Sequence, residues 1–233
     1  MDVVISVVMP FWQRQAVLTK NLQRYKELYP DLPLEIVVVD DGSPEPAVIE
    51  GEFPWPVHLI RLPAKAGPKD SVVPLNVGAL YAKGEYLVLT GPEIVHREPV
   101  LAGMLETARA MGPLSHVSPA VWGGSWWYCH SSDMPADAKT GRAPSPQGAA
   151  LHFCAMLKRD VFFAVDGFGH EYRDGAGYSD NDFLWKLHDI GVSFAIRDDL
   201  VTDHIECPRC NWPPGAFKRN KDIFNRKWRS RFS

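Results

Sequence analysis

Glu93 is the carboxylate of this sequence whose position most suggests catalysis. It follows Gly91 and Pro92, which end the apolar run of residues 86–89, and that run has the pattern of a buried strand. A carboxylate on a proline-stiffened turn is thereby placed at the carboxyl end of a strand, the edge of an open α/β sheet where ligands bind. We predict that Glu93 helps to hold a divalent metal ion bound to a nucleotide diphosphate. The alternative is a solvated acidic turn.

His204 is the second predicted metal ligand. It ends the extended segment of residues 200–204, so that it follows a predicted strand, as Glu93 does. A carboxylate and an imidazole suit Mn²⁺ or Mg²⁺ when open positions remain for phosphate oxygens. Such an ion neutralises a departing diphosphate without proton transfer. The prediction requires that these two distant side chains meet at one ion; the alternative is an ordinary histidine at a strand end.

Two further clusters have the chemistry of nucleotide recognition. Asp40 and Asp41 end a β-branched run, where a carboxylate can accept a hydrogen bond from a base or a ribose. Turn or helix capping explains the same residues equally well. Lys65 and Lys69 flank a glycine in a loop that precedes Asn76, which suits phosphate binding. A solvated loop explains either lysine alone better.

Asp180 is the predicted general base. It lies at the start of residues 180–190, which have the apolar periodicity of an amphipathic helix. Acidic residues also favour helix N-termini for electrostatic reasons, so this placement has a structural explanation as well. In the functional interpretation, Asp180 deprotonates an acceptor hydroxyl within hydrogen-bond reach.

The elements that position these groups open with a strand, a helix and a strand. Residues 3–9 and 34–39 are β-branched runs, and residues 16–28 place their apolar positions on one helical face. Such a βαβ unit requires parallel strands and a right-handed crossover. Further strands are predicted at 57–62, 117–121, 192–196 and 200–204, helices at 72–82 and 99–111, and regular structure at 151–157 and 159–164.

A long loop is predicted at residues 123–148, which are rich in glycine, serine, proline and aromatic residues without a clear period. Trp122, Trp126, Trp127 and Tyr128 cluster at its start; such rings stack on sugars but fill cores equally well. Cys207 and Cys210 form a single Cys-x-x-Cys pair, so a zinc site is a minor alternative here.

Composition limits the classes of protein that fit. The 233 residues are 45% hydrophobic, and 25 basic against 28 acidic side chains give a net charge of −3, which argues against a nucleic-acid partner. No run approaches the roughly 18 apolar residues of a membrane-spanning helix. The first residues lack a basic leader, and four cysteines do not suggest a disulfide scaffold. We therefore expect a reduced, cytoplasmic protein without a signal peptide.

In their order and spacing, these motifs resemble the GT-A-fold glycosyltransferases, and most closely the inverting family 2. The matching segments are VVMPFWQR, IVVVDDGSP, NVG followed by AKGEY, GFGHEY and GYSDNDFLWKLHDIG, with FNRKW as a closing segment. The resemblance implies a Rossmann-like α/β fold with a mixed, mostly parallel sheet flanked by helices. It implies one domain over residues 1–210, with a nucleotide-binding half at about 1–96 and an acceptor half at about 97–210. A basic tail, residues 211–233, would follow.

The resemblance also implies residue roles. Asp40 would contact the nucleotide base with Asp41 nearby, and Asp180 would be the base of a Glu-Asp motif whose first position is Ser179 here. The Asp-x-Asp metal motif falls on Gly91-Pro92-Glu93 and lacks its first carboxylate, while His204 matches a late metal-binding histidine. The predicted nucleotide-contacting residues are Pro10, Phe11, Arg14, Asp40, Asp41, Lys65, Lys69, Asn76, Gly91 and Pro92.

The function implied is transfer of a sugar from a nucleotide-diphosphate donor, with UDP as the expected nucleotide, to a hydroxyl of a carbohydrate acceptor with inversion. Mn²⁺ or Mg²⁺ would be the cofactor. One alternative is a non-catalytic module that binds sugars or nucleotide-sugars and has a degraded metal site. A nucleotidyltransferase would need a glycine- and lysine-rich loop after the first strand, which residues 10–14 do not form. The basic tail either contacts an anionic membrane or polyanionic acceptor, or is a solvated helix.

Overall fold

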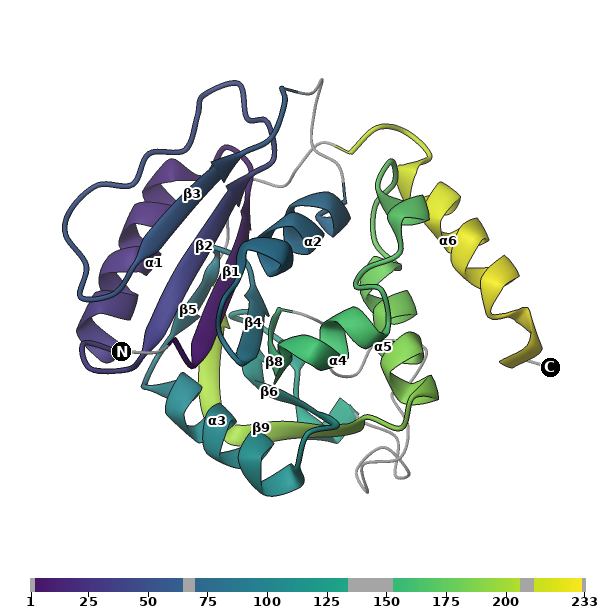
Figure 1. Cartoon of the computed structure of the whole chain (residues 1–233). Helices are drawn as coiled ribbons and strands as arrows, with labels where there is room; N and C mark the ends of the chain where they lie inside the picture. The colour runs from purple at the N-terminus through teal and green to yellow at the C-terminus, as the bar shows by residue number, and fades with distance from the viewer. Residues whose placement is uncertain (1–2, 65–69, 134–152, 206–211, 232–233) are drawn as a thin grey trace.

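One mixed sheet with helices on both faces organises the chain (Figure 1). The computed structural model describes residues 3–64, 70–133, 153–205 and 212–231. The strands are β1 (Ile5–Phe11), β2 (Leu34–Asp40), β3 (Val57–Arg61), β4 (Tyr86–Thr90), β5 (Ile94–His96), β6 (Ser115–Trp122), β7 (Trp127–Cys129), β8 (Cys154–Lys158) and β9 (Ser193–His204). The helices are α1 (Gln15–Leu28), α2 (Val72–Tyr81), α3 (Val100–Met111), α4 (Arg159–Ala164), α5 (Ser179–Asp189) and α6 (Ala216–Lys227), with 3₁₀ turns η1 (Ser131–Asp133), η3 (His170–Tyr172) and η4 (Arg229–Arg231).

The first half of the sheet is parallel, as the βαβ pattern predicts. β1 pairs with both β2 and β4, and β2 pairs with β3, all in parallel. Every residue of β2 and β4 is buried, because helices cover both faces of these β-branched runs. The carboxyl ends of β1, β2 and β4 therefore meet at one edge of the sheet.

The second half mixes strand directions. β8 lies between β4 and β6 and is antiparallel to both, whereas β6 is parallel to β9. The two late segments predicted at 192–196 and 200–204 form one strand, β9, and the short strands β5 and β7 were not predicted. The sheet order is β3-β2-β1-β4-β8-β6-β9-β5, with β7 beside β6, so the mixed α/β fold class is confirmed.

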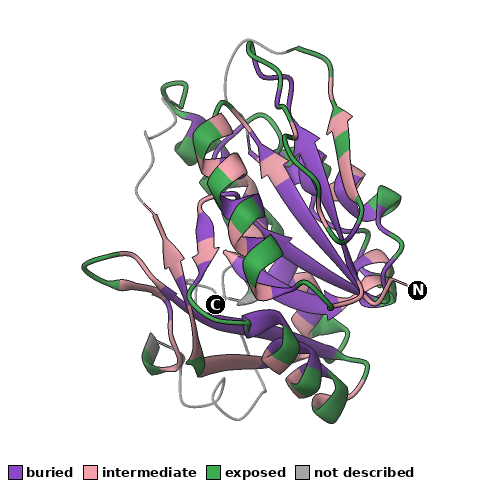
Figure 2. Cartoon of the chain, turned by 90° about the vertical axis from the view of Figure 1, so that its left-hand side faces the viewer, coloured by how far each residue is buried: buried purple, intermediate pink, exposed green. Residues whose placement is uncertain are grey.

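Two hydrophobic cores separate the helices by sheet face. α1 and α3 pack on one face through residues such as Leu22 and Met104. α2, α4, α5 and α6 pack on the other, where Phe183 and Phe224 are buried. Figure 2 shows the buried residues following the strands, with exposed residues on the outer sides of the helices.

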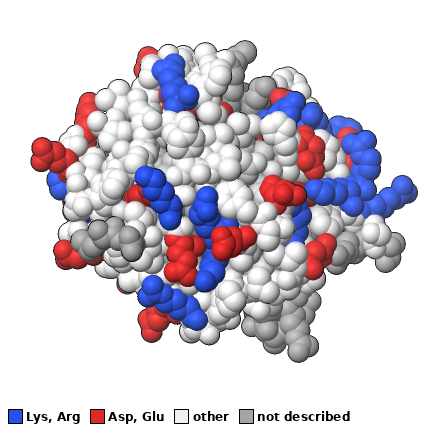
Figure 3. Space-filling view, viewed as in Figure 1, with Lys and Arg blue, Asp and Glu red and all other residues white. Residues whose placement is uncertain are grey.

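The segment predicted as a basic tail contains α6, which lies beside α5 in Figure 1. Its Asn220 and Phe224 are buried, so this helix is part of the packed structure. Lysine and arginine side chains gather over it at the right of Figure 3, which places its charges on the outer side. Within the described ranges, no helix has the length and apolar character needed to cross a membrane.

Candidate active site

Two adjoining cavities lie at the carboxyl edge of the parallel strands. Cavity A is lined by Pro10, Phe11, Trp12, Arg14, Asp41, Ser71, Pro74, Gly91, Glu93 and Trp212. Cavity B is lined by Asp70, Ser71, Leu75, Phe153, Phe168, Gly177, Ser179, Asp180 and Trp212. The volume of cavity A is about 180 Å³ and that of cavity B is about 210 Å³. Each is smaller than a typical ligand site of roughly 300–1,000 Å³. Because Ser71 and Trp212 line both, the two cavities suit two parts of one larger site.

Sheet register brings part of the predicted nucleotide site together in cavity A. Pro10 and Phe11 end β1, Asp41 follows β2, and Gly91 follows β4, so three parallel strands deliver these residues to one edge. Arg14 comes from the loop between β1 and α1 and adds a cation. The cavity thus combines one positive charge with two carboxylates, an arrangement that suits a phosphate-bearing ligand.

Glu93 lies in cavity A in an ion pair. Its Oε2 is 2.7 Å from Nη1 of Arg14, and both side chains are about four-fifths buried, with 18% and 20% exposed. A Cβ on Gly91 would lie 2.7 Å from the Glu93 Cδ atom, so the carboxylate folds back over the glycine. A side chain at position 91 would therefore require the carboxylate of Glu93 to move, which the flexible end of that side chain allows.

His204 is near Glu93 in the backbone but not in side-chain direction. The Ile205 amide donates to the Glu93 carbonyl over 3.0 Å, and His204 pairs with Ile94 in the β5–β9 ladder. Opposite residues in an antiparallel pair face the same side, and Ile94 is buried in the core. The His204 ring accordingly packs on Tyr128, 4.7 Å between centroids, and lines neither cavity.

The metal site of Glu93 and His204 stays a prediction. Among the residues that the structure describes, no three or more His, Cys, Asp or Glu side chains group as ligands of a metal ion. Glu93 and Asp41 both offer carboxylate oxygens in cavity A, and Glu93 is paired with the side chain of Arg14. His204 stays the predicted second ligand, and its half-buried ring packs on Tyr128 and Phe153.

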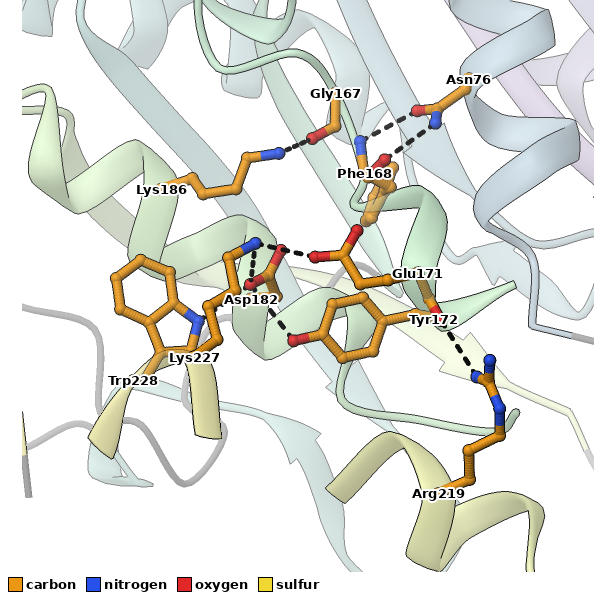
Figure 4. A network of polar contacts seen from close by, with 10 residues as sticks. All are labelled: Asn76, Gly167, Phe168, Glu171, Tyr172, Asp182, Lys186, Arg219, Lys227 and Trp228. Carbon is orange, nitrogen blue, oxygen red and sulfur yellow. Dashed lines mark hydrogen bonds and ion pairs between the residues drawn. The ribbon is translucent and has the colours of Figure 1, made fainter. Parts of the chain in front are cut away.

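Three other predicted contact residues make hydrogen bonds within the protein, and their nucleotide contacts stay predictions. Asp40 is buried and its two oxygens accept hydrogen bonds from the amides of Ser43 and Ala47, so it shapes the loop after β2. Asn76 makes two 2.9 Å hydrogen bonds to the backbone of Phe168 (Figure 4). The Pro92 carbonyl accepts a hydrogen bond from a side chain of α1. None of the three lines either cavity.

Lys65, Lys69, Cys207 and Cys210 lie outside the described residues, as does most of the predicted loop from position 134 onward. Their predicted roles therefore stay predictions. The described start of that loop forms β7 and η1, and the Trp127 and Tyr128 rings pack against neighbouring aromatic and histidine rings.

Asp180 lies in cavity B, in the first turn of α5. The preceding residues Gly177 and Tyr178 both have positive φ, 67° and 65°, and this bend aims the start of the helix at the cavity. Burial raises the pKa of Asp180, and hydrogen bonding from the Asn181 amide opposes that rise. A raised pKa brings a carboxylate closer to the range in which it acts well as a general base.

Asp70, Ser71 and Trp212 line the cavities but were not predicted to. Asp70 and Ser71 precede the apolar run of α2, which is the ordinary position of acids and serines before a helix. That signal indicates a helix start and nothing more. Their proximity to Asp180 arises from contacts between segments about a hundred residues apart, for which the sequence carried no sign.

The end of α6 and the residue after it contact a buried carboxylate, Asp182, in the first turn of α5 (Figure 4). Asp182 is fully buried, and its Oδ1 accepts hydrogen bonds from Trp228 Nε1 at 2.9 Å and from the Tyr172 hydroxyl at 3.3 Å. Lys227 lies 2.8 Å from the same oxygen and also pairs with Glu171. Burial alone would lower the pKa of Lys227, but these two carboxylates outweigh it and raise that pKa.

A second α6 side chain reaches the segment before α5. Asn220 is buried and donates to the carbonyls of Tyr172 and Gly177, at 3.0 and 2.9 Å. A Cβ on Gly175 would lie 2.0 Å from the Asn220 Oδ1 atom, so the amide occupies space that only glycine leaves. The far wall of cavity B thus depends on α6 for its shape.

Comparison with known proteins gives consistent matches. The family model described as "Glycosyl transferase family 2" matches residues 6–163. An "Uncharacterized glycosyltransferase" of Haemophilus influenzae is 31% identical over 187 residues, which are 78% of this chain and 61% of that protein.

Solved structures show the same fold. The mannosyltransferase PcManGT from Pyrobaculum calidifontis, in complex with GDP-Man and Mn²⁺, superposes with a TM-score of 0.63 at 19% identity, over 85% of this chain and 56% of that one. S. aureus TarS 1-349 gives 0.64 at 14% identity, over 87% and 60%. The chain therefore spans about three-fifths of the length of these relatives.

Proposed function

Because the chain belongs to glycosyl transferase family 2, we propose that it moves a sugar from a nucleoside-diphosphate donor to an acceptor hydroxyl group. One observation carries this proposal: cavity A, with its cation and carboxylates, adjoins cavity B, with the half-buried Asp180, across Ser71 and Trp212. A donor in cavity A would thus present its sugar to an acceptor in cavity B. The common wall is where the two reacting atoms would meet.

Donor binding is assigned to cavity A. Arg14 is the chain's own cation there and would bind diphosphate oxygens, while Asp41 would accept hydrogen bonds from the nucleoside. UDP is our proposed nucleotide. An incoming diphosphate competes with Glu93 for Arg14, because both are anions that the same guanidinium can bind.

Glu93 would hold a divalent cation, for which Mn²⁺ and Mg²⁺ are proposed. Its carboxylate lines cavity A, and Mg²⁺ commonly takes one or two carboxylates together with substrate phosphates. When bound, the ion would supply positive charge to the leaving diphosphate. The structural neighbour PcManGT was solved with Mn²⁺ and GDP-Man, which supports this part for the fold.

Asp180 is proposed as the general base of the transfer. It would take the proton of the acceptor hydroxyl while that oxygen bonds to the anomeric carbon of the donor. The bond from the anomeric carbon to the diphosphate oxygen breaks, and the nucleoside diphosphate leaves with the bonding electron pair. A single displacement of this kind inverts the configuration at carbon. Trp212, 41% exposed, offers an apolar face on which a sugar ring can pack.

A donor survey tests the proposal. Calorimetry with UDP, GDP, CDP and dTDP, each with and without Mn²⁺, should show binding of one nucleotide class. Incubation with matching nucleotide-sugars and a panel of sugar acceptors should then release nucleoside diphosphate. If no nucleotide binds and no donor turns over, the proposed function is wrong.

A non-catalytic binding module is the second candidate. The observation in its favour is the altered metal motif, in which Gly91 replaces a carboxylate and Glu93 is already paired with Arg14. Binding of a nucleotide or nucleotide-sugar without turnover of any donor would favour the module. Contact of α6 with an anionic membrane or acceptor, and a cytoplasmic location, stay predictions.

A further inference from the structure

Asp70 is a buried carboxyl that the proposed mechanism does not use. It is only 5% exposed, it precedes α2, and it lines cavity B together with Asp180. A buried acid beside a reaction cavity requires an explanation, because burial of a charge without good partners is costly.

The partners of Asp70 come from three distant segments. Ser179, the first residue of α5, donates its hydroxyl to Oδ1 over 2.7 Å. Asn220 of α6 donates to Oδ2 over 3.4 Å, and the Asp70 amide donates to the Gly175 carbonyl over 3.2 Å. One carboxyl group therefore connects the start of α2, the start of α5 and the middle of α6.

We propose that Asp70 is a positioning residue for the acceptor step: it fixes the first turn of α5 through Ser179 and places a second carboxyl group against the cavity that Asp180 faces. This inference rests on the proposed function. Ser179 and Asp180 are neighbours in that first turn, so a hydrogen bond that holds one restricts the other. A shift of about 1 Å in a catalytic group can cost roughly a hundredfold in rate.

The electrostatics of the cavity agree with this role. The pKa of Asp70 is raised to about 7: burial is the largest cause and the negative charge of Asp180 adds to it, while the Ser179 hydrogen bond opposes the rise. The other groups that face Asp70 are Tyr172 on η3 and the neutral amide of Asn220 on α6.

Arg219 donates a hydrogen bond to the amide oxygen of Asn220, and Asn220 in turn contacts Asp70. Asp70 and Asp180 thus titrate as an interacting pair in a small cavity. The negative charge of Asp180 contributes to the raised pKa of Asp70, so Asp70 takes up its proton while Asp180 is still ionised.

The substitution Asp70→Asn in the full chain tests the inference, because it keeps the size of the side chain and removes the charge. We expect transfer to fall about tenfold from loss of positioning. Because the pKa of Asp70 is about 7, we also expect the kcat profile of Asp70→Asn to lose the change that wild type shows between about pH 6 and pH 8. Donor affinity should be unchanged. A kcat profile with the wild-type slope in this range would contradict the inference.

Two further variants separate position from charge. Ser179→Ala breaks the link to α5 but keeps both carboxyl groups, so turnover should fall while the change in kcat near pH 7 is retained. Asp174→Asn is the matched control, because it removes an exposed acid from the segment just before α5. It should change neither quantity. A Ser179→Ala variant with wild-type turnover would contradict the positioning role.

A measurement without substrate distinguishes failure of this inference from failure of the proposed function. A carboxyl whose pKa rises on folding binds its proton more tightly in the folded state, so wild-type stability falls as pH rises from about 4 to about 7. The Asp70→Asn variant does not lose stability in this way. The thermal midpoint of the variant minus that of wild type should therefore increase as the pH rises from about 4 to about 7.

A midpoint difference that is flat with pH would contradict the inference even if transfer is observed. A difference that rises with pH, in a protein that turns over no donor, would contradict the proposed function alone.

Discussion

Cavities A and B differ in what holds their walls. In cavity A, the ends of three parallel strands set the backbone, and the charge of Glu93 is offset by Arg14 at 2.7 Å. In cavity B, the walls are helix starts and loops tied by side-chain hydrogen bonds from α6. Its two carboxyls, Asp70 and Asp180, both have raised pKa values.

This difference suits the two tasks proposed for them. A cation that is already placed attracts a diphosphate, whereas a buried carboxyl with a raised pKa accepts a proton. The comparison also predicts different effects of substitutions in the two cavities. Substitutions in cavity A should alter donor binding, and substitutions in cavity B should alter turnover. Four substitutions test that separation.

Asp180→Asn should have the largest effect. Loss of the base is expected to lower transfer at least about a hundredfold, because general base catalysis contributes roughly 10²–10⁴-fold. The affinity for the nucleotide should persist, since Asp180 does not line cavity A. Initial transfer rates and calorimetry measure the two quantities.

Asp189→Asn, an exposed acid at the other end of α5, is the control and should behave as wild type. Near-normal transfer by Asp180→Asn would remove Asp180 from the base role.

Arg14→Gln should come next and should act on the donor side. Loss of a charge-assisted contact costs about 1.5–3 kcal/mol, so nucleotide affinity should fall roughly 10- to 100-fold. Turnover at saturating donor should fall less. Calorimetric titration with the nucleotide that binds wild type measures this.

Lys20→Gln removes an exposed cation of α1 that lines neither cavity, and serves as the control. Unchanged affinity in Arg14→Gln would show that cavity A does not bind the diphosphate through this side chain.

Lys227→Met should reach cavity B indirectly. Asp182 would lose its charged partner while fully buried, which should lower the free energy of unfolding by about 1–2 kcal/mol. Transfer should fall severalfold because the first turn of α5 is less well held, and donor affinity should not change.

Urea unfolding and transfer assays measure these two effects. Lys221→Met, an exposed lysine of the same helix, is the control. Equal stability of the Lys227→Met and control variants would argue against support of α5 by α6.

Gly91→Ala should have the smallest effect on the fold. The new methyl group meets only the flexible end of Glu93, so stability should change by less than about 0.5 kcal/mol. Nucleotide affinity in the presence of Mn²⁺ should change severalfold, because the carboxylate is displaced. The same substitution in a Glu93→Ala background should then have no further effect. A full effect in that background would place its cause elsewhere.

The sequence predicted the parallel opening and the edge where cavity A lies. β-branched runs that end in turn residues define strands directly, and parallel strands must present their ends together. That reasoning was enough to place Pro10, Phe11, Asp41, Gly91 and Glu93 near one another. It required no knowledge of side-chain direction.

Side-chain direction is what the sequence did not reveal. The ring of His204 packs on Tyr128, a contact set by pairing with the three-residue strand β5, and so short a strand has no readable period. Asp40 was assigned a nucleotide contact, yet local amides satisfy both of its oxygens. The carboxyl group of Asp70 accepts a hydrogen bond from Asn220, which lies 150 positions later in the chain. Contacts of that separation leave no local pattern.

The position of Asn220 against Gly175 has a consequence for the order in which the molecule is made. Translation delivers β1 to β4, and with them most of the donor edge, long before α6 emerges from the ribosome. Until the Asn220 side chain packs against Gly175, the segment before α5 lacks the hydrogen bond that Asn220 donates to the Gly177 carbonyl. The segment before α5 therefore acquires its full set of contacts only after the C-terminal helix has been synthesised.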